Sequence, residues 1–405
     1  MSELKKIFTP AVIHLPEYAS ESALWEKWSV IACDQFTSQP EYWAEVERIV
    51  GEDMSTYKFV LPEAYLGTDK EFDHKKVISA SAEKILPTLK AYDKAIVYLE
   101  RELPDGRVRA GIVGKIDLLY YNYEKGSNPA ICATEETVIE RIPARVETRA
   151  NSVVEMPHAM LFFDDEQNKI LSYLASVKDE MKKLYDFTLM CGGGSIKGYL
   201  VEGEQLDTLY NMISEYESSK DGAVYAVGDG NHSLAAAKAW YGMIREKYGD
   251  DADLHPARYA LCELINIHDD AIDFEPIYRI LKNVNAEEFL SELPDSGHKV
   301  TAVVGESERE VYFPESHILR MGSMQNYIDA YLLKHPKVEC DYIHGEDVLR
   351  DLAKDENTIG FLCDGIEKEN LLTYVSKYGS LPRKTFSMGT AYTKRYYLET
   401  RYIRE

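Results

Sequence analysis

The sequence has little positive charge and no long apolar run. Its 405 residues include 46 Lys and Arg against 69 Asp and Glu, which gives a formal net charge of −23. Binding to a nucleic-acid backbone requires clustered lysine and arginine, and docking on anionic lipid requires the same sign of charge. No stretch contains the roughly 20 consecutive apolar residues that a membrane-spanning helix needs. We therefore expect neither a nucleic acid nor a membrane as a partner.

Cysteine is also scarce. The six cysteines are spread along the chain and form no C-x-x-C pair. This spacing argues against a disulfide framework and against a structural zinc site. The start of the chain is interrupted by Pro10 and His14 and has no small-residue cleavage site, unlike a signal peptide. We expect a cytoplasmic protein.

The composition is that of a globular protein, with 45% hydrophobic and 28% charged residues. Short apolar runs alternate with longer amphipathic ones, which indicates mixed α/β (α+β) structure with helices flanking mixed sheets. The length predicts two or three subdomains. We place them at residues 1–140, 141–285 and 286–405. The sequence has no linker rich in Pro, Gly or Ser, so the subdomains are expected to be closely associated.

Periodicity predicts the individual elements. Strands are expected at residues 28–33, 95–99, 108–116, 144–163, 199–201, 224–227, 259–267, 299–304 and 358–363. Helices are expected at residues 40–50, 170–185, 205–216, 232–248, 287–293 and 324–333. The turn residues Pro104, Asp105 and Gly106 predict a hairpin between the second and third strands.

The strongest local signal is Gly228–Ser233, which joins an apolar strand to an alanine-rich helix. Free N–H groups and the positive dipole end make such a helix start an anion site. Gly230, Asn231 and Ser233 are therefore candidate cofactor-binding residues. Asp229 could hold magnesium or accept a hydroxyl proton, and His232 could donate to a phosphate oxygen or act as acid and base. Alternatively, these residues form an ordinary N-cap and turn with a first-turn histidine.

The motif also resembles a known family. Asp229–Ser233 is similar to the Asp-Gly-His-His-Arg signature of the domain-of-unknown-function 1015 family of bacteria and archaea. Three further segments resemble that family in the same order: Ile31–Phe36, Phe274–Arg279 and Leu381–Phe386. The resemblance covers nearly the whole chain. Asn231 replaces a His and Ser233 replaces the Arg of the signature, which removes a cation that could bind phosphate bidentately.

The signature is also similar to the turn of ParB-like and sulfiredoxin-like nucleotide-binding domains, which include free-serine kinases. This resemblance implies a ParB/sulfiredoxin-like element around Asp229, with nucleotide phosphates at the helix start. ATP, ADP or CTP with Mg²⁺ is the implied cofactor, and a phosphorylated small molecule is the implied ligand. The hypothesis is a nucleotide- or phosphometabolite-dependent phosphotransferase or phosphohydrolase. The alternatives are a non-catalytic anion- or nucleotide-binding regulatory module and a metal-dependent hydrolase, and a homo-oligomer stays open.

Acidic residues at two other strand ends extend this hypothesis. Asp34 lies at a strand-to-helix junction and is a third catalytic candidate, with an ordinary turn carboxylate as the alternative. His268 and Asp269 close the strand at 259–267. If that strand runs parallel to the strand at 224–227, both residues meet Asp229 at one sheet edge and complete a metal site. The alternative is a polar turn at the strand end.

Three basic residues are further cofactor-binding candidates. Lys197 follows the glycine-rich segment Met190–Ser195, whose backbone amides could cradle an anion; a flexible connection is the alternative. Arg145 belongs to Arg141–Arg149, where three arginines lie within nine residues. Lys384 follows Arg383. In both cases, the alternative is that these basic residues alternate on the solvated face of a strand and pair with surrounding glutamates.

Overall fold

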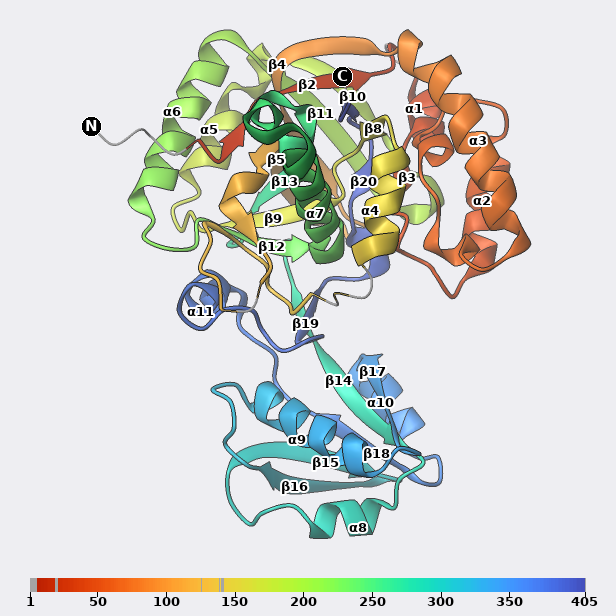
Figure 1. The fold of residues 1–405 in the computed structure, drawn as a ribbon, viewed down its shortest axis with the longest axis vertical. Helices are drawn as coiled ribbons and strands as arrows, with labels where there is room; N and C mark the ends of the chain where they lie inside the picture. Colours follow the sequence, from red (N-terminus) through yellow and green to blue (C-terminus); the bar gives the residue numbers. More distant parts are fainter. Residues whose placement is uncertain (1–5, 19–20, 125, 138, 140–141, 405) are drawn as a thin grey trace. The chain divides into compact units, whose positions relative to one another are not determined.

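The structure is a computed structural model. It describes residues 6–18, 21–124, 126–137, 139 and 142–404. The fold is mixed α/β, as predicted, and the chain divides into two compact units (Figure 1). Unit 1 comprises Met1–Ile272, Leu372–Gly379 and Thr390–Glu405, and unit 2 comprises Asp273–Leu371 and Ser380–Gly389. The subdivision at residues 140 and 285 stays a prediction.

A large mixed sheet forms the centre of unit 1. Its strands in spatial order are β10 (Lys182–Thr188), β11 (Ser195–Val201), β4 (Lys90–Glu102), β5 (Val108–Asp117), β13 (Tyr259–Asn266), β9 (Ala159–Phe163), β12 (Tyr225–Asp229), β7 (Ile131–Cys132) and β6 (Tyr121–Asn122). In addition, β1 (Phe8–Thr9) pairs with β5 and β2 (Ala11–Leu15) pairs with β4. The predicted hairpin is confirmed, because β4 and β5 are antiparallel neighbours.

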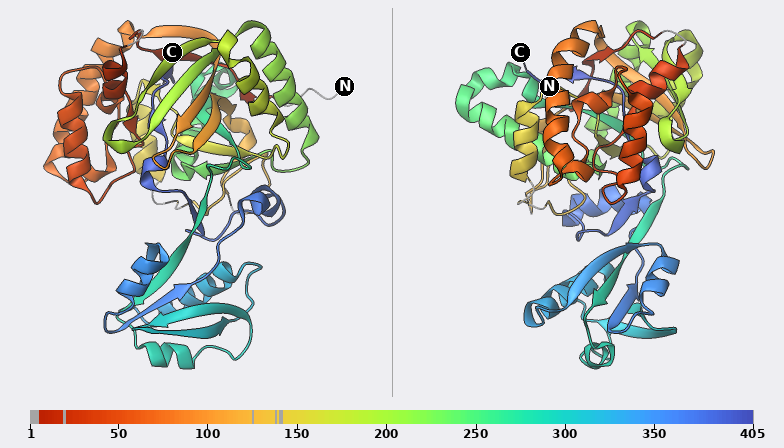
Figure 2. Two further views of the ribbon diagram at one scale, coloured as in Figure 1. Left: turned by 180° about the vertical axis from the view of Figure 1, so that it is seen from behind. Right: turned by 90° about the vertical axis from the view of Figure 1, so that its right-hand side faces the viewer.

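Both faces of this sheet are covered, because successive strand residues point to opposite sides. On β4, Ile96 and Tyr98 belong to one core and Val97 and Leu99 to another. The helices of the first core are α4 (Ile142–Asn151), α5 (Lys169–Val177), α6 (Gly203–Ser219) and α7 (Asn231–Tyr248). Those of the second are α1 (Ser22–Trp28), α2 (Pro40–Val50) and α3 (Asp69–Ile85), which lie together in Figure 2.

The C-terminal segment of unit 1 is tied in by two short strand pairs. β20 (Tyr396–Tyr397) pairs with β3 (Val30–Ile31), and β21 (Arg401–Tyr402) pairs with β8 (Val154–Glu155). This pairing brings residues from the end of the sequence next to the β3–α2 junction.

Unit 2 has its own sheet, in the order β16 (Ser307–Phe313), β15 (His298–Val304), β18 (Thr358–Leu362), β14 (Phe274–Lys282) and β17 (Glu339–His344), with β19 (Phe386–Met388) on β14. Helices α8 (Ala286–Ser291) and α9 (Arg320–Lys334) share one core with it, and α10 (Glu346–Leu352) shares a second core. Helix α11 (Leu371–Tyr378) is assigned to unit 1 apart from its first residue. Among the described helices, none combines the length and apolar character needed to cross a membrane.

Two element predictions were wrong. The expected strand at 144–163 begins with helix α4, because Ile142 and Val146 are four residues apart and bury one helical face against α7. The expected helix at 170–185 ends at Val177, and β10 follows from Lys182. Tyr185 and Phe187 are buried with the period of two that is typical of a strand.

The expected parallel arrangement of the strands at 224–227 and 259–267 was also wrong. Strand β9 lies between them, antiparallel to β12 and parallel to β13. Thus β12 and β13 run in opposite directions, and their carboxyl ends lie toward opposite ends of β9. Asp229 is paired with Met160 near the start of β9, whereas Asn266 is paired with Phe163 at its end.

Candidate active site

The strand-to-helix bend at Gly230 has the predicted form. β12 ends at Asp229 and α7 begins at Asn231, and Gly230 between them has a φ of 85°, a left-handed conformation that favours glycine. A Cβ at this position would lie 2.9 Å from His158 Cδ2 and 2.9 Å from Ala159 Cα. The absence of a side chain therefore lets the start of β9 approach the bend. The residue at the N-cap of α7 is Gly230, which has no side chain to cap the first turn.

His158 connects the bend to Asp34. Its Nε2 lies 3.5 Å from Asp34 Oδ2, and Gln35 Nε2 donates to Asp34 Oδ1 at 2.9 Å. Burial alone would raise the pKa of Asp34. The charge of His158 and its hydrogen bond outweigh burial and, with Gln35 and Lys394, hold that pKa well below its ordinary value. Asp34 is therefore ionised at neutral pH.

Tyr397 holds the other side of the imidazole. His158 Nδ1 lies 2.6 Å from Tyr397 Oη, and this hydroxyl donates to Cys33 Sγ at 3.4 Å. Burial opposes protonation of His158, but Tyr397 and Asp34 outweigh it and hold the pKa of His158 above its ordinary value. Burial itself raises the pKa of Tyr397, so its hydroxyl stays protonated. The result is an imidazolium fixed between a carboxylate and a phenol.

Lys394 brings Asp229 into the same group. Its Nζ lies 3.5 Å from Asp229 Oδ2, and its charge also contributes to the lowered pKa of Asp34. The side chains of Asp34, His158, Asp229 and Lys394 are 28%, 14%, 21% and 9% exposed. Asp34, His158 and Asp229 are thus partly exposed, and Lys394 is buried. We call Asp34, His158, Asp229, Lys394 and Tyr397 the polar cluster.

Two arginines from the β4–β5 hairpin hold the backbone around Lys394. Arg101 donates to the carbonyls of Lys394, of Tyr392 at 2.6 Å and of Gly193 at 3.2 Å. Arg109 donates to the carbonyl of Thr393 at 2.9 Å. Both arginines are only 1% exposed. The carbonyls of Tyr392, Thr393 and Lys394 are consecutive, so these hydrogen bonds fix the backbone from which the Lys394 side chain extends.

These arginines belong to a buried ionic group with an excess of positive charge. Arg109 Nη2 lies 3.7 Å from Glu263 Oε1, and Arg395 Nη1 lies 3.1 Å from Glu263 Oε2. Arg395 also pairs with Glu399. Three arginines, counting Arg101, therefore face two glutamates, all at most 1% exposed. A buried net positive charge next to the polar cluster favours an anionic ligand.

The other residues of the bend have distinct positions. Asn231 is 8% exposed; its Oδ1 accepts from Thr134 N at 3.2 Å and its Nδ2 donates to Thr134 Oγ1 at 3.3 Å. Its side chain therefore holds the loop after β7. His232 and Ser233 lie half-buried in the first turn of α7. Of the predicted residues, the structure thus brings Asp34 together with Asp229, Gly230, Asn231, His232 and Ser233.

The three basic candidates have surroundings of their own. Lys197 is exposed on β11, in register with Glu100 and Asp186 on the adjacent strands. Arg145 forms an ion pair with Glu63, and Lys384 belongs to unit 2, where it is exposed. Arg141 lies outside the described residues.

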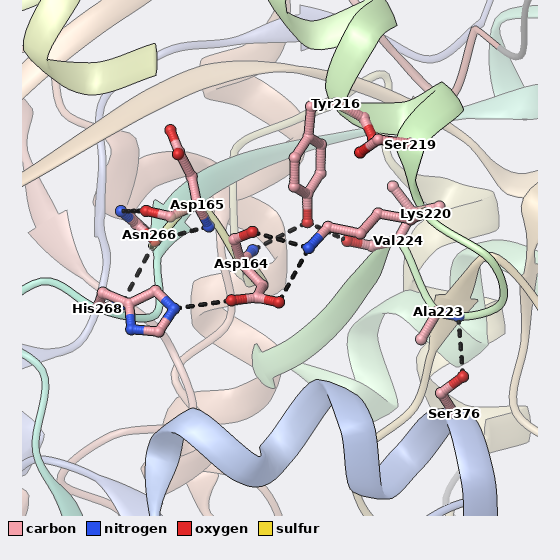
Figure 3. Close-up of polar contacts among 10 residues, drawn as sticks. All are labelled: Asp164, Asp165, Tyr216, Ser219, Lys220, Ala223, Val224, Asn266, His268 and Ser376. Carbon is pink, nitrogen blue, oxygen red and sulfur yellow. Dashed lines mark hydrogen bonds and ion pairs between the residues drawn. The ribbon is translucent and has the colours of Figure 1, made fainter. Parts of the chain in front are cut away.

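His268 takes part in a different group at the other end of β9 (Figure 3). Its Nε2 lies 2.7 Å from Asp164 Oδ1, and Lys220 Nζ donates to Asp164 Oδ2 at 2.9 Å. Asp269 accepts from the backbone N–H groups of Ala110 and Ala271. These residues do not join Asp229, and no group of three or more His, Cys, Asp or Glu among the described residues could hold a metal ion.

The sequence analysis did not identify three members of the polar cluster, His158, Lys394 and Tyr397. His158 directly precedes β9 and follows Pro157. A proline indicates the start of a strand rather than its interior, so Pro157 could have placed His158 at the start of β9. Lys394 and Tyr397 belong to no motif. They reach the site only because β20 pairs with β3.

The fold and the polar cluster define a mixed α/β protein in which carboxylates and cationic side chains lie together at a strand-to-helix bend. Residues 16–400 match the family model described as "Protein of unknown function (DUF1015)". The chain belongs to this family, as the sequence motifs predicted. A comparison with curated proteins finds no match.

Solved structures with a similar chain course include three of low identity. A free serine kinase in complex with AMP is 14% identical, with a TM-score of 0.37 and coverage of 72% of this chain and 90% of that one. A conserved hypothetical protein from Pyrococcus furiosus is 12% identical, with a TM-score of 0.35 and coverage of 72% and 94%. SbnI from Staphylococcus aureus, truncated at its C-terminus, is 9% identical, with a TM-score of 0.34 and coverage of 72% and 83%.

Proposed function

We propose that this protein is a nucleotide- or phosphometabolite-dependent enzyme that transfers or hydrolyses a phosphoryl group on a small molecule. One observation carries the proposal: the polar cluster gathers carboxylates and cations from distant parts of the sequence at the start of α7. Asp34, Asp229 and Lys394 come from three segments that are far apart along the chain. Such a gathering of charged side chains, in which the pKa of Asp34 is held well below its ordinary value, is typical of a functional site.

The phosphate would lie at the start of α7. The first N–H groups of the helix have no partner within it, and α7 is 18 residues long, so its dipole is fully developed. Lys394 lies on the same side as Asp229 and supplies a positive charge. The buried excess of arginine adds a positive field that needs no rearrangement when the ligand arrives.

Asp34 would orient the group that accepts the phosphoryl. In phosphoryl transfer, correct positioning of the acceptor hydroxyl matters more than its deprotonation before the reaction. Because the pKa of Asp34 is lowered, its carboxylate can accept a hydrogen bond from that hydroxyl at neutral pH. His158, held between Asp34 and Tyr397, keeps the carboxylate in place and could donate to an anionic oxygen.

Magnesium fits this site only together with a nucleotide. The described residues offer Asp34 and Asp229 but no group of three ligands, and each of the two carboxylates already faces a cation. Mg²⁺ is commonly bound by one or two carboxylates with substrate phosphates and water. When bound in this way, it would neutralise phosphate charge.

The proposal predicts that nucleotides with magnesium stabilise the folded protein. A ligand that binds only the native state raises its melting temperature by mass action. We expect a higher melting temperature with ATP, ADP or CTP at millimolar concentration, and the increase should be lost in Lys394→Ala. Lys197→Ala is the matched control, since Lys197 is an exposed lysine on β11. An unchanged melting temperature with every nucleotide would contradict the proposal, as would loss of the effect in Lys197→Ala alone.

The regulatory module remains a second candidate because of Asn231. This residue replaces a histidine of the family signature, and its amide is bound to Thr134. Measurement of product separates the two candidates. If nucleotide binds at the polar cluster but is never consumed in the presence of small hydroxyl compounds, the non-catalytic alternative is favoured.

A further inference from the structure

A cavity of about 500 Å³ lies beside the second half of α7, formed by residues of that helix, the end of α4, the turns that follow α7 and Arg404. Its size falls within the range of small-molecule sites. All of its lining residues belong to unit 1. None of them is a member of the polar cluster, so this cavity requires its own explanation.

Aromatic rings form one side of the cavity. Trp240 and Tyr248 lie two helical turns apart on α7, and both rings pack around His255. The rings of Tyr248 and His255 are nearly parallel, at 18°, whereas Trp240 is edge-on to His255 at 82°. Tyr248 is 47% exposed, whereas Trp240 is 5% exposed. The exposed part of the Tyr248 ring is suited to packing against a flat ring of the ligand.

Among the described residues, the rim of the cavity carries more positive than negative charge. Of these residues, Lys247 and Arg404 line it together with one carboxylate, that of Asp251. Neither Lys247 nor Arg404 forms an ion pair with a carboxylate of the described residues, whereas most arginines of this acidic chain do. Lys247 Nζ instead lies 4.8 Å from the centre of the Tyr248 ring. The aromatic surface and an unpaired cation are thus adjacent.

We propose that this cavity binds a small aromatic anion, a flat ring that carries a carboxylate or phosphate group. The ring lies against Tyr248 and Trp240, and the anionic group is bound by Lys247 and Arg404. A guanidinium binds either anion through paired N–H donors. The site is separate from the proposed nucleotide site and does not depend on it.

The test uses benzoate and phenyl phosphate as probes, with acetate and benzyl alcohol as controls that lack the ring or the charge. Binding to the full chain is measured by isothermal titration calorimetry and by saturation transfer to the ring protons, without nucleotide. We expect both probes, or one of them, to bind at least about tenfold more tightly than either control, because each half of the ligand adds binding energy. Comparison of the two probes identifies the preferred anionic group.

Exposed residues supply the variants, so the fold is not at risk. Lys247→Ala with Arg404→Ala should weaken binding by about tenfold or more, the loss expected for charge-assisted hydrogen bonds. Tyr248→Ala should do the same. Arg245→Ala, on α7 but outside the cavity lining, should leave affinity unchanged. The proposal is overturned if neither probe binds at about 10 mM, if acetate or benzyl alcohol binds as tightly, or if the double variant binds like the wild type.

Discussion

Replacement of Arg101 by methionine tests whether the buried arginines hold the site together. Met has a similar length, so it fills the space but donates no hydrogen bond. The carbonyls of Lys394, Tyr392 and Gly193 would lose their donor in a region where water does not replace it. An unsatisfied buried polar group costs about 1–3 kcal/mol, and three carbonyls would lose their donor. Removal of the guanidinium also relieves its repulsion with Arg109 and Arg395, which offsets part of this cost. We expect the free energy of unfolding of unit 1 to fall by about 3–5 kcal/mol.

Urea denaturation followed by tryptophan fluorescence measures this change. The four tryptophans, at positions 25, 28, 43 and 240, all lie in unit 1, so their signal reports that unit. Arg101→Lys should be intermediate, because an ammonium group cannot reach all three carbonyls in the geometry of a guanidinium. Arg107→Met is the control, since Arg107 is 40% exposed and pairs with Asp105 at the hairpin turn; its cost should stay below about 1 kcal/mol.

A second readout concerns function. If Arg101 positions Lys394, the variant should also lose most of the stabilisation by nucleotide at a urea concentration where it is still folded. The reasoning is refuted if Arg101→Met unfolds at the same urea concentration as Arg107→Met.

Two further predictions concern the bend and its pH dependence. Gly230→Ala should lower the free energy of unfolding by at least about 2 kcal/mol, because an alanine in the left-handed conformation costs about 1–2 kcal/mol and its Cβ would clash with Ala159. Gly242→Ala is the control, because a Cβ at this position meets nothing within 4 Å. This variant should leave the free energy of unfolding unchanged or raise it. Asp34→Asn should lower the free energy of unfolding most between about pH 4 and 6.5. The lowered pKa of Asp34 stabilises the native state above the ordinary carboxyl pKa, and this stabilisation is lost as the pH falls through the lowered pKa. The raised pKa of His158 stabilises the native state below the ordinary imidazole pKa, and this stabilisation is lost as the pH rises through the raised pKa. Melting temperatures across pH check this, and a difference that does not shrink toward low pH and toward high pH contradicts it.

The sequence was sufficient for elements with a clear period or a turn signal. The β4–β5 hairpin, helix α2 and the bend at Asp229 formed where predicted, because their signals are local: Gly106 and Gly230 both have a positive φ. The strand expected at 144–163 was wrong at its start, where the arginines at 145 and 149 have the spacing of four that is the helical period.

The site could be predicted only in part. Asp34 and Asp229 were recognised because each follows a strand. Their convergence depends on the pairing of β20 with β3 and on the order of β9 between β12 and β13. Strand order is decided by the packing of the whole sheet and cannot be deduced from a short window of sequence. For this reason the sequence analysis did not find His158 and Lys394, and it placed His268 at the same sheet edge as Asp229.

The path of the chain has a consequence for biosynthesis. Lys394 and Tyr397 follow the whole of unit 2 in the sequence, yet they contact residues translated near the beginning, such as Cys33. The ribosome must therefore finish the inserted unit before the segment that carries both residues can close onto the sheet, and a nascent chain stalled within unit 2 lacks two members of the polar cluster. Contacts of such long sequence separation are also slow to form, so this closure is expected among the last steps of folding.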